Sequence, residues 1–124
     1  MKRYTGVLIN TTVSFGSMEN PIAQIIDSIV ERDKLVTVIS DISEKVVGYV
    51  TEYRKVDHVL MCDFIIDTNI YKTFSEALFI SARIGEIGSK LTDTGTIKFA
   101  GELSHVIVSS TKKDSSFNEV KPIE

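Results

Sequence analysis

The sequence predicts an α+β protein, mainly an antiparallel β-sheet or barrel of about six to seven short strands with two helices packed against it. Short runs rich in β-branched residues recur along the chain, as is typical of strands. One early segment instead repeats isoleucine at helical spacing. The chain has 124 residues, of which 43% are hydrophobic. We therefore expect one globular domain over residues 1–111, followed by a polar, flexible C-terminal tail over residues 112–124, which could also act as an arm that orders on a partner.

The first strand is expected from Tyr4 to Asn10, followed by a polar loop up to residue 19. Asn20 and Pro21 then form a helix start, an N-cap residue followed by proline at the first helical position. The predicted helix covers residues 21–32, because its apolar side chains form one stripe: Ile22, Ile25, Ile26, Ile29 and Val30.

The middle and end of the chain predict six more strands and a short second helix. The helix is expected over residues 70–78, where apolar side chains again follow helical spacing. Gly85 and Gly88 are expected to break the strand before them, and Asp57 and His58 to lie at a hairpin tip. The strands are expected at residues 35–39, 46–53, 59–66, 79–84, 96–100 and 103–110.

Bulk properties argue against several classes of function. The net charge is −3 without a basic stripe, so we expect no nucleic-acid partner. We expect no membrane partner, transmembrane segment or signal peptide, because the apolar runs are too short. A single cysteine, Cys62, suits a reducing compartment, and we expect it to be a small buried residue. With only two histidines and no metal-binding spacing, no metal or cofactor is expected.

Ser81, Arg83 and His105 are the candidate catalytic residues. Ser81 could act as a nucleophile at a strand end, with Arg83 or backbone N–H groups stabilising an oxyanion. The alternative is a strand serine that bonds to backbone, with Arg83 on the solvent face. Strand alternation places His105 on one face with Leu103 and Ile107, so it is either a histidine held in an apolar groove or a general base.

Four segments together resemble a known family: Val47–Tyr53, Phe64–Thr68, Ile80–Gly85 and Ser104–Val108. They are similar to parts of the tailed-phage prohead proteases, the serine proteases of capsid maturation. That family shares a β-barrel-like fold with the herpesvirus assemblins. Its nucleophile block reads Ile-Ser-Ser-Arg-Gly, and the third segment resembles this block.

The chain also departs from the family pattern. The family has its general-base histidine before the first of these strands, whereas residues 36–41 contain no histidine. Ala82 replaces the second serine, and the family's closing aspartate is absent near His105. Since a serine without a base is a poor nucleophile at neutral pH, the resemblance implies a protease-like fold that binds rather than cleaves.

The resemblance thus predicts a bacteriophage virion protein, an auxiliary or decoration protein of the capsid, located in the virion or the host cytoplasm. Its partner would be a capsid protein, another virion protein or a second copy of the chain. One alternative is a small serine endopeptidase in which Ser81 works with His105. Another is a generic protein-interaction module whose likeness to the proteases is accidental.

Overall fold

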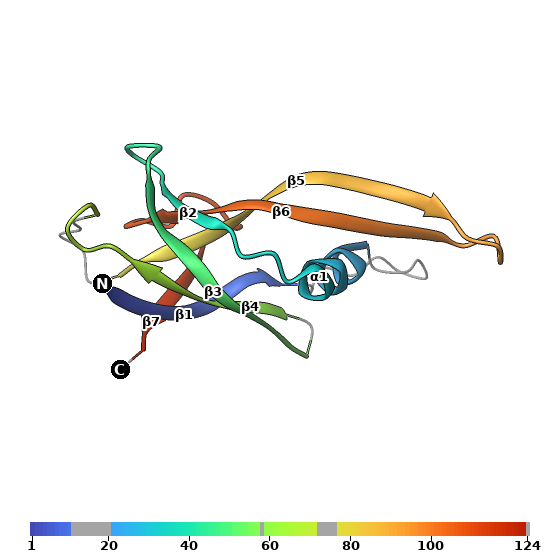
Figure 1. Ribbon diagram of the computed structural model, residues 1–124, viewed down its shortest axis with the longest axis horizontal. Helices are drawn as coiled ribbons and strands as arrows, with labels where there is room; N and C mark the ends of the chain where they lie inside the picture. The colour runs from blue at the N-terminus through green and yellow to red at the C-terminus, as the bar shows by residue number, and fades with distance from the viewer. Residues whose placement is uncertain (11–20, 58, 72–76, 124) are drawn as a thin grey trace.

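The chain folds into a closed seven-stranded β-barrel with one helix at its side (Figure 1). The computed structural model describes residues 1–10, 21–57, 59–71 and 77–123. Around the barrel the strand order is β1-β4-β3-β2-β6-β5-β7, and β7 pairs back onto β1. The elements are β1 (Lys2–Asn10), α1 (Pro21–Arg32), β2 (Thr37–Ser40), β3 (Val46–Val56), β4 (Val59–Ile66), β5 (Phe79–Leu91), β6 (Ile97–Ser109) and β7 (Asn118–Pro122).

The barrel interior is filled by alternate side chains of the strands, because successive residues of a strand point to opposite faces. The rings of Tyr4 on β1 and Phe64 on β4 stack with centroids 5.5 Å apart. Cys62 is fully buried, as expected, and burial raises the pKa of its thiol to about 12. Other fully buried core side chains are Val38, Val50, Leu60, Ile80, Val106 and Val108.

Helix α1 has the bounds that the sequence predicted, and it lies along β6. Ile25, Ile26 and Ile29 are its buried residues. Its polar side chains bond to the backbone of β6. The Gln24 Oε1 atom accepts the Phe99 N–H at 2.6 Å, and the Ser28 Oγ atom accepts the Gly101 N–H at 3.0 Å. Side chains of α1 thus take the place of a neighbouring strand along this part of β6.

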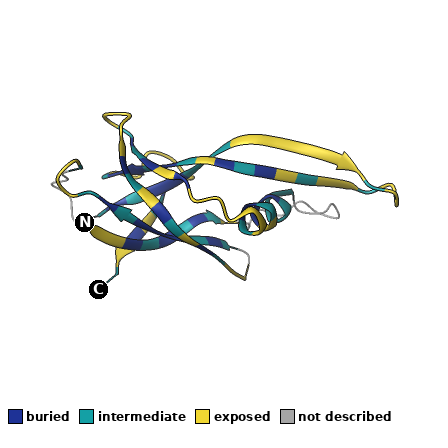
Figure 2. Cartoon of the chain, viewed as in Figure 1, coloured by how far each residue is buried: buried dark blue, intermediate teal, exposed yellow. Residues whose placement is uncertain are grey.

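The β5–β6 hairpin is much longer than the barrel wall. Its two strands pair from Phe79 and Ser109 out to Leu91 and Ile97. Figure 1 shows the distal part projecting away from the barrel, with α1 beside it and both chain termini at the opposite end. We call residues 86–101 the arm. Figure 2 shows that the β5 side of the arm is exposed over most of its length.

The C-terminal segment corrects the expected flexible tail. Residues 118–122 form β7, which pairs with both β1 and β5 and closes the barrel. Phe117 and Val120 are buried, so apolar contacts as well as backbone hydrogen bonds hold this segment. β1 and β5 each present a strand edge here, and the segment pairs with both of them although its composition is polar.

Three further details of the prediction differ from the structure. α1 is the only helix in the described ranges; the predicted second helix falls largely on residues 72–76, which lie outside them, and residues 68–70 form a turn. The sheet is not wholly antiparallel, because β2 pairs with β6 in parallel. Gly85 and Gly88 do not break β5, since hydrogen bonds to β6 carry the strand past both. α1 is also too short to cross a membrane.

A charged cluster joins three strands of the barrel. Arg54 on β3 donates from Nη1 to Asp63 Oδ2 at 2.8 Å and from Nη2 to Thr5 Oγ1 at 3.0 Å. The hydrogen bond from Arg54 lowers the pKa of Asp63, and burial opposes this shift. Because the carboxylate is mostly buried and paired, its ionised form stabilises the folded state.

We expect Asp63→Asn to lower the free energy of unfolding by about 1 kcal/mol at pH 7, since Arg54 is partly exposed and solvent screens the pair. A lowered folded-state pKa stabilises the protein above the unfolded value of about 4 and is lost as the pH falls through the folded value. Urea unfolding should therefore show the difference from wild type shrinking under acid conditions. Glu52→Gln, at the exposed partner of Arg54, serves as control.

Two glycines of the arm make a matched pair for testing how α1 packs. A Cβ atom on Gly101 would lie 2.7 Å from Ile25 Cγ2, whereas a Cβ atom on Gly88 would meet nothing within 4 Å. Gly101→Ala should cost about 1–3 kcal/mol of stability by overpacking, and Gly88→Ala should cost none. Guanidinium unfolding followed by circular dichroism measures both, and equal effects would contradict close packing at Gly101.

Candidate functional site

Ser81 lies at the centre of a polar cluster between β5 and the loop before β7. Its side chain is fully buried. Arg83 donates from Nη1 to Ser81 Oγ at 3.1 Å, and Ser81 Oγ lies 2.7 Å from Ser116 Oγ. Ser116 Oγ in turn donates to Asp114 Oδ1 at 2.5 Å. Two of the predicted site residues, Ser81 and Arg83, are therefore in contact, and two residues from the supposed tail join them.

The direction of these hydrogen bonds follows from the donors available. Arginine can only donate, and the single hydroxyl proton of Ser116 is directed to the carboxylate of Asp114. Ser81 must therefore donate its own proton to Ser116. Hydrogen bonds from the side chain and backbone of Ser116 lower the pKa of Asp114, so the carboxylate at the end of this chain is a weak base.

His105 lies on β6 directly opposite Arg83 in the sheet register. The hydrogen bond of its ring joins Nδ1 to the hydroxyl of the neighbouring Ser104 at 3.0 Å. Among the described residues, no hydrogen bond links Ser81 to a histidine. His58, the second histidine, lies outside the described residues.

A β-bulge changes the face that His105 was expected to share. Ile84 pairs with Leu103 and Arg83 with His105, so β6 carries one extra residue, Ser104, at this point. Leu103 consequently points into the core and is buried, whereas His105 is only half-buried. The predicted common face of Leu103 and His105 is therefore wrong.

Chemically, the cluster suits anchoring better than nucleophilic attack. The Ser81 hydroxyl forms no hydrogen bond with an imidazole among the described residues, and a fully buried oxygen is closed to a peptide substrate. The guanidinium of Arg83 lies over the ring of Phe117, 5.9 Å from its centroid. Arg83 thus holds the loop before β7 through both a ring contact and Ser81.

The residues missed by the sequence prediction are Asp114, Ser116 and Phe117. An aspartate two residues before a serine is a frequent turn-forming pattern, and here Asp114 Oδ1 accepts the Ser116 backbone N–H at 2.8 Å. That turn, with apolar Phe117 and Val120 soon after it, was the available signal that the tail is ordered.

No group of three or more metal-ligating side chains occurs within residues 1–10, 21–57, 59–71 and 77–123. The nearly buried carboxylate of Asp41 is held by the chain itself. Its Oδ2 atom accepts a hydrogen bond from Ser109 at 3.0 Å and pairs with Lys113 at 2.9 Å. This carboxylate therefore fastens the turn after β2 to the end of β6.

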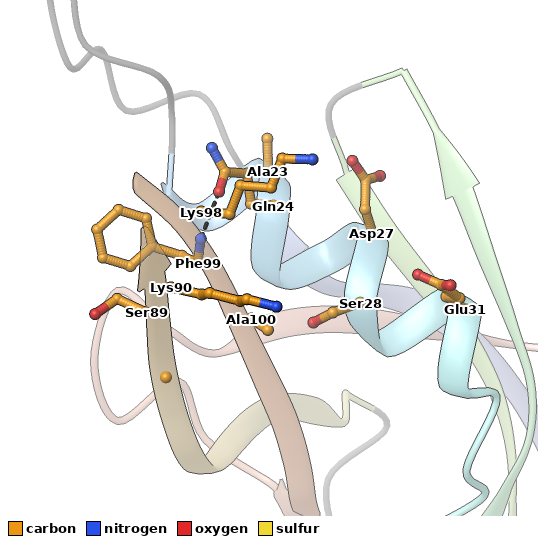
Figure 3. A pocket seen from close by; sticks show the side chains of 11 residues that line it. Ala23, Gln24, Asp27, Ser28, Glu31, Ser89, Lys90, Lys98, Phe99 and Ala100 are labelled. Carbon is orange, nitrogen blue, oxygen red and sulfur yellow. Dashed lines mark hydrogen bonds between the residues drawn. The ribbon is translucent and has the colours of Figure 1, made fainter. Parts of the chain in front are cut away.

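Two concave surfaces flank the arm. The first is an open groove of about 800 Å³ between α1 and one face of the arm. Figure 3 shows Asp27 and Glu31 on its helical wall and Lys90 and Lys98 on the arm, with the hydrogen bond from the Phe99 N–H to Gln24 joining the two walls. The groove is thus lined by opposite charges on its two walls.

The second, which we call the slot, has a volume of about 350 Å³. It lies where the end of β1, the start of α1 and β5 meet, and it is mainly apolar. Its lining includes Leu8, Ile22, Ile25, Ile84, Ile87 and Ser116. Because Ile87 belongs to the arm, the slot is continuous with the arm surface.

We expect the wild-type protein to remain unlabelled by a serine-directed fluorophosphonate, because Ser81 is buried and donates its proton to another hydroxyl. Intact-mass spectrometry measures the label, and an active serine hydrolase controls for the reagent. A label that Ser81→Ala removes would contradict this expectation and support the endopeptidase hypothesis.

Comparison with known proteins gives no family for this chain: no family model matches it, and neither a curated protein nor a solved structure shows significant similarity. The resemblance to prohead proteases therefore remains a hypothesis that depends on the four short segments quoted above.

Proposed function

We propose that this chain is a non-catalytic protein-binding module that engages its partner through the arm and the adjoining slot. The observation that carries this proposal is the β5 edge of the arm. Among the described residues, β7 pairs with β5 only at Phe79 and Ile80, so residues 81–91 have no strand partner on that edge. An open edge of this kind can accept a strand from another chain.

The two edges of the arm are unlike each other. Along β6, Gln24 and Ser28 of α1 bond to the backbone and occupy the edge. Along β5, no described element takes that place. A strand added from outside would therefore join β5 rather than β6.

Exposed apolar side chains lie beside this open edge. Ile87 is 62% exposed and Leu91 is 68% exposed, and both lie on β5. Ile97, directly opposite Leu91 on β6, is 53% exposed. Burying such a patch in an interface yields about 25 cal/mol per Å² of apolar surface. Grouped on one projecting hairpin next to the slot, these side chains support protein binding.

The identity of the partner as a capsid or other virion protein, and the location in a virion or host cytoplasm, come from the resemblance to prohead proteases. A generic interaction module would use the same arm and slot, so this hypothesis differs from the virion-protein hypothesis only in the identity of the partner. Endopeptidase activity through Ser81 and His105 is the competing hypothesis, and fluorophosphonate labelling separates it from binding.

Photo-crosslinking in the cells that naturally contain the protein tests the binding function. A benzophenone amino acid at Leu91 should yield discrete adducts, because this side chain is placed in the interface. The same probe at Ile42 should yield none. Ile42 is a suitable control because it is 78% exposed and belongs to the turn between β2 and β3, away from the arm. Gel electrophoresis and mass spectrometry identify the adducts, and equal patterns at the two positions would contradict the proposal.

A further inference from the structure

We infer that the strand which joins the open edge of β5 is the β5 strand of a second copy, paired antiparallel about a two-fold axis that passes through Gly88. This inference rests on the proposed binding function of the arm and names its partner. It is carried by the charges on one face of the arm and by the position of the slot.

The β5–β6 hairpin holds two like-charge pairs on the same face, one within the arm and one at its base. Lys90 lies directly opposite Lys98, and Glu86 lies directly opposite Glu102. Like charges in directly opposed positions of a sheet destabilise it. Glu102 is compensated by Lys34 at 2.8 Å and Arg32 at 3.6 Å. In contrast, Lys90, Lys98 and Glu86 form no ion pair with any described residue.

Asp27 and Glu31 face Lys90 and Lys98 across the groove without forming an ion pair with them, whereas a second copy in this register places a countercharge directly opposite Lys90 and Glu86. When Gly88 lies opposite Gly88, Glu86 lies opposite Lys90 of the second copy, and Lys90 lies opposite its Glu86. Paired residues of antiparallel strands place their side chains on the same face of the sheet. In the four-stranded sheet that the joined arms form, the acidic pair of each copy would then lie next to the basic pair of the other copy.

The same register brings an apolar side chain to the slot. Leu91 of the second copy reaches the level of Gly85, the extra residue of a bulge in β5, beside Ile84 and Ile87, which both line the slot. Leu91 is on the face of the arm that carries Ile87, since the two are four residues apart and β5 is regular between them. The exposed leucine of each copy thus meets the slot of the other, as a two-fold interface requires.

Gly88 allows the two strands to approach at the axis. It carries no side chain, and a Cβ atom placed there would meet nothing within 4 Å in the single chain. A cysteine at this position therefore fits the fold and lies on the axis next to its own copy. Opposed Cα atoms of antiparallel strands are about 4.5–5.5 Å apart, within the range that a disulfide spans.

Disulfide trapping of the purified full chain tests the register. Gly88→Cys should form a covalent dimer under mild oxidation, whereas Lys98→Cys on the other strand of the arm should not. The two copies of residue 98 would lie three strand spacings apart across the sheet, about 14 Å, and four residues apart along it, about 13 Å. Cys62 is fully buried and does not compete. Equal trapping at the two positions, or none at Gly88→Cys, would overturn the inference.

Charge reversal tests the same interface without a covalent bond. Glu86→Lys and Lys90→Glu should each weaken the dimer about tenfold or more, because each turns two attractive contacts into repulsive ones. The double variant restores opposite charges and should recover wild-type association. Sedimentation equilibrium measures the dissociation constants, and melting temperatures confirm that the exposed substitutions leave the fold intact. Failure of the double variant to recover would overturn the charge pairing.

The outcomes also separate this inference from the proposed function. A wild-type chain that stays monomeric in sedimentation overturns the inference. If Leu91 then still gives adducts with another protein in cells, the binding function stands with a different partner. If Leu91 gives no adduct at all, the binding function fails as well. An adduct of twice the chain mass at Leu91, absent at Ile42, supports both.

Discussion

The short length of β7 determines where the barrel ends and where the arm begins. β7 bridges β1 and β5, but its pairing with β5 stops at Ile80, while β5 continues to Leu91. Beyond that point no strand formed by the described residues lies between β1 and β5, and the slot is found there. The same five-residue strand thus closes the core at one end and leaves an open edge at the other. The arm, the slot and the exposed edge of β5 all follow from the early end of β7, which pairs with β5 only as far as Ile80.

The cluster around Ser81 belongs to this same closure. β7 makes few backbone pairs, so the loop before it needs other anchors. Arg83 lies against Phe117 and bonds to Ser81, and Ser81 bonds to Ser116. A serine and an arginine two residues apart on a strand can therefore hold a loop in place, and their spacing alone does not distinguish this role from that of a nucleophile and its oxyanion donor. The partner of the serine hydroxyl does distinguish them, and here that partner is another hydroxyl.

Features set by neighbouring residues were predictable from the sequence, and features set by distant ones were not. The apolar stripe after Pro21 defines α1, and the turns at Asp57 and Gly95 have the positive φ angles of hairpin tips. Contact between Ser81 and Arg83 follows from strand alternation. By contrast, Ser116 bonds to Ser81 from 35 residues away in the sequence, and β7 forms a strand by pairing with the edges of β1 and β5. The bulge at Ser104 likewise depends on pairing with β5, so it reversed the expected face of Leu103 without a local signal.

An open strand edge normally invites indiscriminate pairing, and charged side chains are a common defence. The arm applies this defence selectively, because Glu86 and Lys90 form attractive contacts with a second copy only in the register centred on Gly88 and repel their own counterparts in two others. Sliding the copy by two residues from the register centred on Gly88 removes both contacts between Glu86 and Lys90. Sliding it by four residues places Lys90 opposite Lys90, or Glu86 opposite Glu86, according to the direction. The opposed lysines of the arm, which form no ion pair with a described residue, therefore also specify the one register in which both copies gain an attractive contact.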